Sequence, residues 1–283
     1  MVDAIAYVNG DYIALEQARI SVLDRGFLFA DSVYEVIPVY AGRCYRLQAH
    51  IQRLQHSLAG IRLAVNRSAS DWAELIRTLV ERNGGGDTSV YLQVTRGCMP
   101  RREHRLPTHP EPGVVAFCQP RAAIDPGVLE HGIKAVTRTD TRRQQCSIKA
   151  TALLANVLLA DDAHAAGAAE ALLLRDGCVV EGASSNVFMV NDGSITTPAL
   201  RDDILAGITR GVIIELAQAN GMPCSQIPAP GIEQVRAADE IWVTSSTREI
   251  YPVTQLDDIA VGDGQPGPIW AKMSALLHSD TDV

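Results

Sequence analysis

Two residues of this chain have types and surroundings that suit covalent chemistry on a carbonyl group. Lys149 carries an amine that can hold an aldehyde as a Schiff base, provided that its pKa is lowered enough to populate the neutral form. Glu181 begins a turn of small residues, 181–186, where a buried carboxylate can keep a pyridine nitrogen protonated. Each residue alone is weak evidence, because most lysines are solvated and most Glu-Gly turns are simple hairpins. Together they indicate a site for a cofactor that combines an aldehyde with a pyridine ring.

A candidate anion site follows that turn. Segment 203–207 ends at Gly207 and leads into a predicted helix that begins with Ile208 and Thr209. The free N–H groups of a first helical turn attract anions. Hydroxyl groups also cluster over 244–247, at the end of a predicted strand. Taken alone, the first feature would by default be an ordinary glycine-started helix, and the alternative interpretation of the hydroxyl cluster is a solvated turn.

The composition is typical of a globular protein. The chain has 283 residues, 47% of them hydrophobic, and a net charge of −8, which argues against nucleic acid as a general partner. No apolar run reaches the roughly 18 residues of a membrane span, and the N-terminal residues show no signal-peptide pattern. The six cysteines have neither paired nor metal-ligand spacing. We therefore expect a cytoplasmic protein with reduced thiols, no metal site and no membrane partner.

The first half is predicted to be a small α/β domain with local hairpins. Its expected strands are 4–8, 12–15, 32–40, 89–95 and 114–118. Asn9-Gly10 predicts a tight hairpin, and Pro38 predicts an edge or a bulge in the third strand. Apolar residues at helical spacing predict a helix over 47–59, and Ser70 is the expected N-cap of a second helix.

The pattern changes at 119–124, where we place a linker between an N-terminal domain, 1–118, and a larger C-terminal domain, 125–283. The strands expected in the second half are 133–138, 171–175, 186–190 and 241–244, and the expected helices are 148–166, 207–220 and 268–277. The first of these helices would place Lys149 at a helix N-terminus, whose dipole would help to lower the pKa of the amine.

In type, spacing and order these segments resemble the fold-type IV pyridoxal phosphate enzymes, the class IV aminotransferases. The resemblance covers nearly the whole chain and implies an α/β (α+β) fold of a small N-terminal and a larger C-terminal domain. It implies pyridoxal 5'-phosphate as the cofactor, with Lys149 as the Schiff-base lysine and Glu181 as the partner of the pyridine nitrogen. It also implies a homodimer with its active site at the subunit interface.

The resemblance assigns further contacts to the cofactor. The phosphate would lie on the backbone of the first helical turn after Gly207, on the hydroxyls near the end of the strand at 241–244, and on an arginine of the first long helix. The implied cofactor-binding residues, besides Lys149 and Glu181, are Arg53, Ser185, Leu205, Ile208, Thr209, Ser245 and Ser246. Ser184 would line the substrate pocket. The family more often has Ser or Thr where this chain has Ala183, so any hydroxyl role there is lost.

Two segments are similar to the D-amino-acid aminotransferases within this family. Tyr34 lies in the D-type version of the segment 24–36, whereas branched-chain L-enzymes usually show Phe-Glu-Gly there. The loop 95–107 contains Arg102-x-His104, similar to a motif that traps the substrate carboxylate together with the tyrosine and is supplied by the other subunit. A guanidinium fork suits a carboxylate. Because this loop has one extra residue, Arg101 could take the role of Arg102.

The activity implied is transamination between a D-amino acid, such as D-alanine, and a 2-oxo acid, such as 2-oxoglutarate, with ping-pong kinetics. Lys149 would move the substrate Cα proton, first as base and then as acid. Alternatives of the same fold are a branched-chain L-amino-acid aminotransferase, an (R)-amine transaminase acting on amines without a carboxylate, and aminodeoxychorismate lyase. A non-catalytic cofactor-binding protein would be expected to lack Lys149 or Glu181, and this chain has both.

Overall fold

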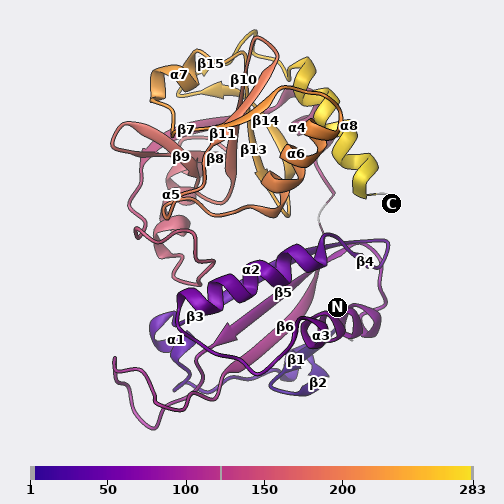
Figure 1. Cartoon of the computed structure of the whole chain (residues 1–283), viewed down its shortest axis with the longest axis vertical. Coiled ribbons are helices and arrows are strands. Elements are labelled where there is room, and N and C mark those ends of the chain that lie inside the picture. The colour runs from indigo at the N-terminus through magenta and orange to yellow at the C-terminus, as the bar shows by residue number, and fades with distance from the viewer. Residues whose placement is uncertain (1–3, 122, 282–283) are drawn as a thin grey trace. The chain divides into compact units, whose positions relative to one another are not determined.

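The chain forms both helices and strands, and the computed structural model describes residues 4–121 and 123–281 (Figure 1). The chain divides into two compact units. The first consists of Met1–Ala122 with Ile148–Leu153, and the second of Ala123–Ser147 with Leu154–Val283. The expected domain limits stay a prediction. The structure adds that the short segment around Lys149 packs with the first unit, although the sequence pattern placed it in the second domain.

The first unit is a six-stranded antiparallel sheet with two long helices packed on it. Its strand order is β2-β1-β6-β5-β3-β4. The strands are β1 (Ile5–Val8), β2 (Asp11–Ala14), β3 (Ser32–Tyr40), β4 (Arg43–Cys44), β5 (Thr88–Thr95) and β6 (Gly113–Pro120), and the helices are η1 (Leu15–Gln17), α1 (Arg25–Phe29), α2 (Leu47–Gly60) and α3 (Ala69–Arg82). Inward residues of β3, such as Val33 and Ile37, meet Leu54 of α2 and Ile76 of α3 in one core. Strand alternation and helical spacing thus supply facing apolar surfaces.

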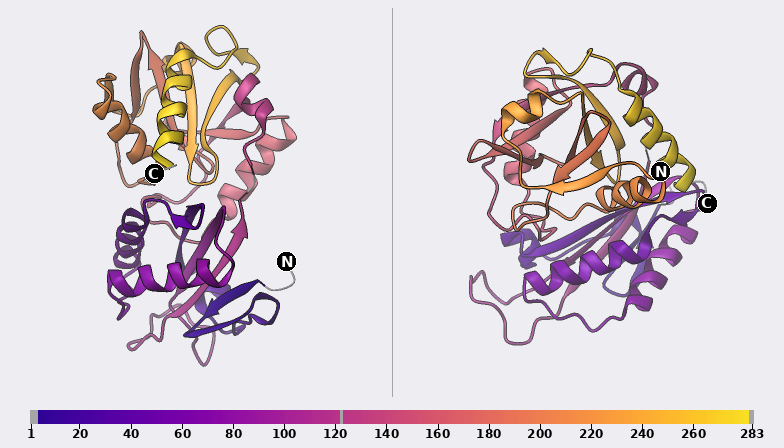
Figure 2. Two further views of the ribbon diagram at one scale, coloured as in Figure 1. Left: turned by 90° about the vertical axis from the view of Figure 1, so that its right-hand side faces the viewer. Right: turned by 45° about the horizontal axis from the view of Figure 1, so that its top comes forward.

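The second unit is a nine-stranded mixed sheet with the order β12-β11-β10-β13-β14-β7-β8-β9, and β15 pairs with β14. Its strands are β7 (Ile133–Thr139), β8 (Glu170–Arg175), β9 (Cys178–Gly182), β10 (Asn186–Asn191), β11 (Ser194–Pro198), β12 (Cys224–Ile227), β13 (Glu240–Ser245), β14 (Glu249–Leu256) and β15 (Ile259–Ala260). The helices are α4 (Pro126–His131), α5 (Leu154–Ala165), α6 (Ile208–Ala219), α7 (Ile232–Arg236) and α8 (Pro268–Thr281). Helices α6 and α8 lie side by side (Figure 2).

The expected helix over 148–166 is wrong in its first turn and a half. Helix α5 begins at Leu154, and the preceding residues run alongside β3. The Lys149 carbonyl accepts a hydrogen bond from the Tyr34 amide at 2.9 Å, and the Thr151 amide donates to the Ser32 carbonyl at 3.1 Å. A backbone that bonds to a strand cannot make the i→i−4 bonds of a helix. Lys149 is therefore not at a helix N-terminus, and the dipole argument for its pKa fails.

The expected N-cap of the second helix is also wrong, by two residues. Ser68, not Ser70, caps α3: its Oγ accepts from the Asp71 amide at 3.2 Å, and the Asp71 carboxylate accepts from the Ser68 amide at 2.7 Å. The reciprocal pair satisfies two otherwise unpaired donors, which a serine at 70 cannot do without an acidic or amide side chain three residues later.

The remaining expected strands and helices are confirmed, and β3 has the predicted bounds. Strand β4 pairs only with Val39 and Tyr40, so Pro38 lies just beyond that pairing, on the part of β3 where a proline costs little. Strand β14, which contains Pro252 opposite Trp242 of β13, was not predicted. The shorter elements, which have too few residues to show a period, were not predicted either: η1, α1, α4, α7, β4, β11, β12 and β15.

Candidate active site

Glu181 is a buried carboxylate, 3% exposed, on β9 of the second unit. Its Oε1 lies 2.5 Å from Arg142 Nη1, and its Oε2 accepts from Asn186 Nδ2 at 3.1 Å and from the Leu205 amide at 3.0 Å. Burial raises the pKa of Glu181 to about 7, and the attraction of Arg142 offsets this effect only in part. A carboxylate so placed can accept a hydrogen bond from a protonated ring nitrogen.

Asn186 joins Glu181 to the start of helix α6. The side-chain amide of Asn186 donates both to Glu181 and to the Leu205 carbonyl, the latter at 2.9 Å. A Cβ at Gly207 would lie 1.9 Å from Asn186 Oδ1, so only glycine fits at this N-cap. The next two amides, of Ile208 and Thr209, belong to the first turn, where helical amides lack intrahelical partners. Asn186 therefore connects Glu181, the predicted partner of the pyridine nitrogen, to the predicted anion site at the start of α6.

The predicted hydroxyl residues of the second unit lie in two turns. Ser184 and Ser185 occupy the turn between β9 and β10, and both hydroxyls donate to Glu170. Ser245 ends β13, and Ser246 follows it in the turn to β14. Strand β13 pairs with β10, with Thr244 opposite Asn186, so the sheet register brings the second turn beside the residue that contacts Glu181.

Lys149 is held in the first unit by its backbone. Its amide donates to Ser57 Oγ of α2 at 3.1 Å, and its carbonyl accepts from Tyr34 of β3. Its Nζ lies 4.3 Å from the centre of the Tyr34 ring, a cation–π distance. Two residues that the sequence analysis assigned separately, to the cofactor and to the substrate carboxylate, are thus neighbours in space.

Arg53 is buried on α2 and belongs to a charged cluster inside the first unit. Its Nε and Nη2 donate to the two oxygens of Glu35, both at 2.7 Å, and His50 Nδ1 lies 2.8 Å from Glu35 Oε2. Burial alone would raise the pKa of Glu35, but the charge and hydrogen bonds of Arg53, together with His50, lower it to about 2. Burial lowers the pKa of His50. The orientation of Arg53 is therefore fixed by Glu35, which the sequence analysis did not single out.

The loop 96–112 carries the predicted carboxylate-binding side chains, and they divide into two groups. Arg102 lies with its Cζ 4.7 Å from the centre of the Phe29 ring, and the His104 ring is 5.1 Å from the same centre. Arg101 is 81% exposed and pairs with Glu103 at 3.3 Å. All three residues are exposed, and the structure brings Arg102 and His104 to the Phe29 ring, whereas Arg101 pairs with Glu103.

Buried Arg25 of α1 holds this loop from the inside. It is paired with Asp31 at 2.8 Å, and its Nη1 donates to the Glu103 carbonyl at 2.5 Å. Weaker contacts of 3.4 Å reach the carbonyls of His104 and Arg105. Because the guanidinium contacts three consecutive carbonyls, the loop has a defined path over residues 103–105, which include His104.

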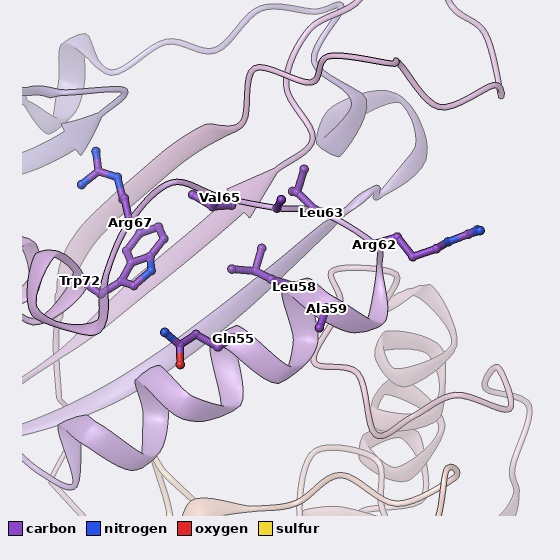
Figure 3. A pocket seen from close by; sticks show the side chains of 9 residues that line it. Gln55, Leu58, Ala59, Arg62, Leu63, Val65, Arg67 and Trp72 are labelled. Carbon is purple, nitrogen blue, oxygen red and sulfur yellow. The ribbon is translucent and has the colours of Figure 1, made fainter.

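A hollow of about 450 Å³ lies elsewhere in the first unit, between the end of α2 and the start of α3 (Figure 3). Its apolar lining includes Leu58, Leu63 and Trp72, and Arg62 points away from it. None of the predicted site residues lines this hollow. Within the described residues no His, Cys, Asp or Glu cluster could hold a metal ion, and no helix there is long and apolar enough to cross a bilayer.

Comparison with known proteins decides the family. A family model described as amino-transferase class IV matches residues 32–256, which include Lys149, Glu181, Gly207 and Ser246. The chain belongs to the class IV aminotransferases. This aminotransferase is 38% identical to the D-alanine aminotransferase of Listeria monocytogenes over 267 residues, covering 94% of this chain and 92% of that relative. It is 36% identical to the D-alanine aminotransferase of Bacillus licheniformis over 271 residues, covering 96% and 95%.

Solved structures confirm the fold-type IV architecture of this aminotransferase. The branched-chain amino acid aminotransferase of Escherichia coli superposes with a TM-score of 0.90 at 26% identity, covering 98% of this chain and 94% of that one. A second branched-chain amino acid aminotransferase, solved with pyridoxamine 5'-phosphate, gives 0.90 at 27% identity and covers 100% and 96%. A fold IV transaminase of Curtobacterium pusillum gives 0.84 at 25% identity, with 99% of both chains covered.

Three residues that contact predicted site residues were not predicted from the sequence: Glu35, Arg142 and Glu170. Glu35 has a signal in the sequence, because it shares the inward phase of β3 with Val33 and Ile37 and a charge on that face demands a partner. Arg142 and Glu170 have a weaker signal in the sequence. Arg142 follows the end of β7 and Glu170 begins β8, but nothing in the sequence names their partners.

Proposed function

We propose that this aminotransferase moves the amino group of a D-amino acid, such as D-alanine, to a 2-oxo acid, such as 2-oxoglutarate, with pyridoxal 5'-phosphate as its cofactor. The observation that carries the D-amino-acid assignment is the placement of Arg102 and His104 together against Phe29. A guanidinium beside an imidazole offers several N–H donors to a carboxylate. The D-alanine aminotransferases that share 36–38% of their residues with this chain support the same substrate class.

The donors and acceptors of the second unit fit pyridoxal phosphate. Glu181 would accept a hydrogen bond from the protonated ring nitrogen, and the amides of Ile208 and Thr209 with the hydroxyls of Ser245 and Ser246 would hold the phosphate. Thr244 Oγ1 is buried and has no partner among the described residues, which leaves a polar atom beside this site for a bound group. Arg53, oriented by Glu35, is the proposed phosphate contact of the first unit.

When bound, pyridoxal phosphate supplies an aldehyde for the amine and a ring that draws electrons from the substrate carbon. The protein supplies the proton transfer. Lys149 would hold the cofactor covalently through Nζ, take the proton from the substrate Cα as a base and return it as an acid. Glu181 would keep the ring nitrogen charged, and Tyr34, Arg102 and His104 would orient the substrate carboxylate. We expect ping-pong kinetics from these residue roles.

We further propose that the enzyme is a homodimer in which Arg102 and His104 act on the partner's site. Both units expose large apolar side chains that a subunit interface would cover: Phe27, near the loop anchor Arg25, is 66% exposed, and Leu154 of α5 is 73% exposed. Mixing Lys149→Ala, which should be inactive, with Arg102→Ala, which should keep at most about a tenth of the wild-type kcat/KM for D-alanine, tests this arrangement. After subunit exchange, about a quarter of the wild-type activity should return if Arg102 acts in trans, since half the dimers are mixed and each has one intact site. No recovery would contradict it.

A substrate comparison tests the proposed reaction. The protein is incubated with 2-oxoglutarate and either D-alanine, L-leucine or an amine without a carboxylate, and the 2-oxo acid, aldehyde or ketone products are quantified. D-Alanine should be the best donor, with D-glutamate formed. A clear preference for L-leucine would favour a branched-chain enzyme instead, in line with the solved relatives of that name. A preference for the simple amine would make the enzyme an amine transaminase.

We propose a cytoplasmic location as well. It is supported by the six cysteines, all of which are free thiols, since disulfides are rare in that compartment. Cell fractionation with an antibody to the protein tests this proposal.

A further inference from the structure

Glu170 is a buried carboxylate, 2% exposed, at the start of β8 in the second unit. Its Oε1 accepts from two backbone amides, that of Ala171 at 3.0 Å and that of Ala183 at 3.1 Å. The first of these is its neighbour in β8, and the second belongs to the turn that follows Glu181. The carboxylate thus ties the start of one strand to the turn that carries the predicted serines.

The other oxygen of Glu170 collects three donors. Ser184 Oγ donates to Oε2 at 3.1 Å, Ser185 Oγ at 2.9 Å, and Arg248 Nη1 at 3.0 Å. With five donors on its two oxygens, Glu170 is saturated as an acceptor and balanced by one cation.

The space around this carboxylate is filled. A Cβ at Gly182 would lie 2.1 Å from Ser185 Oγ and 3.1 Å from Glu170 Cδ. Gly182 therefore allows the glutamate and the serine to close over the backbone directly after Glu181. The arrangement leaves little freedom for the buried Ser185 hydroxyl to turn away from Glu170.

Arg248 connects this cluster to the turn between β13 and β14. Its backbone amide donates to Ser245 Oγ at 3.2 Å, while its side chain reaches Glu170. Arg248 thus contacts the Ser245 hydroxyl, a predicted phosphate ligand, through its backbone. Its ion pair with Glu170 links it to the turn of Ser184 and Ser185.

A serine hydroxyl has one proton and two lone pairs. Because Ser184 and Ser185 give their protons to Glu170, each can only accept further hydrogen bonds. A carboxylate, which also only accepts, gains nothing from either oxygen. Groups that do suit them are donors, such as an amine N–H.

We propose that Glu170 is a positioning residue that fixes Ser184 and Ser185 as hydrogen-bond acceptors toward the bound cofactor and substrate amine, and that Arg248 locks this turn to the Ser245 turn. The inference rests on the proposed function, because it deepens the description of the same site. It leaves the substrate carboxylate to the donors Tyr34, Arg102 and His104, and it makes Ser184 an acceptor in the substrate pocket. The serines contribute equally to substrates with and without a carboxylate.

Replacement of the carboxylate by an amide tests the positioning role. Glu170→Gln keeps the shape but presents an NH₂ group to the hydroxyls, reversing their polarity, and it removes the charge opposite Arg248. Glu240→Gln is the matched control, since Glu240 is also a buried carboxylate of the second unit, where it accepts from the Trp242 indole and the amides of Ile269 and Trp270. The readouts are the affinity of the cofactor-free protein for pyridoxal phosphate, amide hydrogen exchange of residues 183–185, and the melting temperature.

We expect Glu170→Gln to weaken cofactor binding about tenfold, the equivalent of one charge-assisted hydrogen bond, and to speed exchange over 183–185. Glu240→Gln should lower the melting temperature without either effect. Equal effects of the two variants on affinity and exchange, or unchanged affinity in Glu170→Gln, would overturn the proposal. Both readouts need no substrate, so they separate this inference from a failure of D-alanine to react.

Two further variants keep the inference testable if Glu170→Gln does not fold. Arg248→Met should weaken cofactor binding by about threefold, and Arg248→Lys should restore most of it, because a charge on a partly exposed side chain is what links the turns. Ser184→Ala should lower kcat/KM for D-alanine and for an amine without a carboxylate by the same factor. A loss confined to D-alanine would show that Ser184 donates to the carboxylate, and would overturn the proposed polarity.

Discussion

Arg142 Nη1 and Glu181 Oε1 lie 2.5 Å apart inside the second unit, so the carboxylate meets an arginine from its own chain on one side. The side chain of Asp140 has no exposed surface, and it pairs with this arginine at 3.0 Å and with Arg175 at 2.7 Å. A fixed cation at this position limits how far burial can raise the pKa of Glu181. The pair therefore tunes the group that is proposed to contact the cofactor ring.

The Arg142–Glu181 pair predicts a specific pH dependence of the cofactor-free protein. The folded pKa of Glu181, about 7, is above its ordinary value of 4.5, so its contribution to stability is present below pH 4.5 and is lost as the pH rises through about 7. The loss should be about 3 kcal/mol. Arg142→Met should move this loss of stability to higher pH, because the substitution removes the cation that lowers the pKa of Glu181. Urea unfolding across pH 4–9 measures this, and Glu181→Gln should remove the dependence. A profile of Arg142→Met identical to that of the wild type would contradict the coupling.

Glu181→Gln should leave the fold and part of the cofactor affinity intact but slow Cα deprotonation by orders of magnitude. An amide cannot keep a pyridine nitrogen charged as a carboxylate does. Rapid-mixing single-turnover spectroscopy with D-alanine measures the step directly. Rates within a few-fold of the wild type would exclude this role.

Lys149→Ala should abolish covalent attachment of the cofactor and nearly all turnover, because the amine that anchors it and moves the proton is absent. Borohydride reduction of the wild-type enzyme followed by peptide mapping should place the label on Lys149. Lys134, which pairs with Asp258 at 2.8 Å on the surface, provides the control, and Lys134→Ala should keep both label and activity. A label on any other lysine would refute the assignment.

Arg102→Ala should lower kcat/KM for D-alanine at least tenfold, with a smaller effect on amines that have no carboxylate. The lost contact is a charge-assisted hydrogen bond worth about 1.5–3 kcal/mol. Arg101→Ala is the matched control, because its exposed side chain pairs only weakly with Glu103 in the loop. If Arg101→Ala caused the larger loss of kcat/KM, Arg101 rather than Arg102 would be the residue that binds the carboxylate. Near-normal kinetics in both variants would remove the carboxylate trap from the proposal.

Glu35 should govern acid stability of the first unit. Its folded pKa, about 2, is below the ordinary 4.5, so the stabilisation is present above pH 4.5 and is lost as the pH falls toward 2. The loss should be about 3 kcal/mol. Glu35→Gln should lower stability at neutral pH and flatten the acid dependence between these limits, as followed by circular dichroism. Parallel acid curves for the variant and the wild type would disprove the effect.

Local patterns sufficed for much of the fold, because period and capping are properties of neighbouring residues. The Val, Ile and Tyr residues of 32–40 predicted β3 with its bounds, and the apolar residues of 47–59 predicted α2 to within a residue. Local patterns failed for residues 148–153, directly before α5, because this apolar stretch with two alanines has high helix propensity. There the backbone bonds to β3 override that propensity, and no window of sequence includes β3.

By itself the sequence determined which residue types were available for chemistry: a lysine, a glutamate in a small-residue turn, and a glycine-started helix, in the order of class IV aminotransferases. Only the tertiary structure decided their surroundings. It joined Glu35 to Arg53, Arg142 to Glu181, and Glu170 to Ser184 and Ser185. The partners in these pairs are separated by many residues along the chain, so the desolvation and charge that set their pKa values and hydrogen-bond directions arise only when the sheets and helices pack.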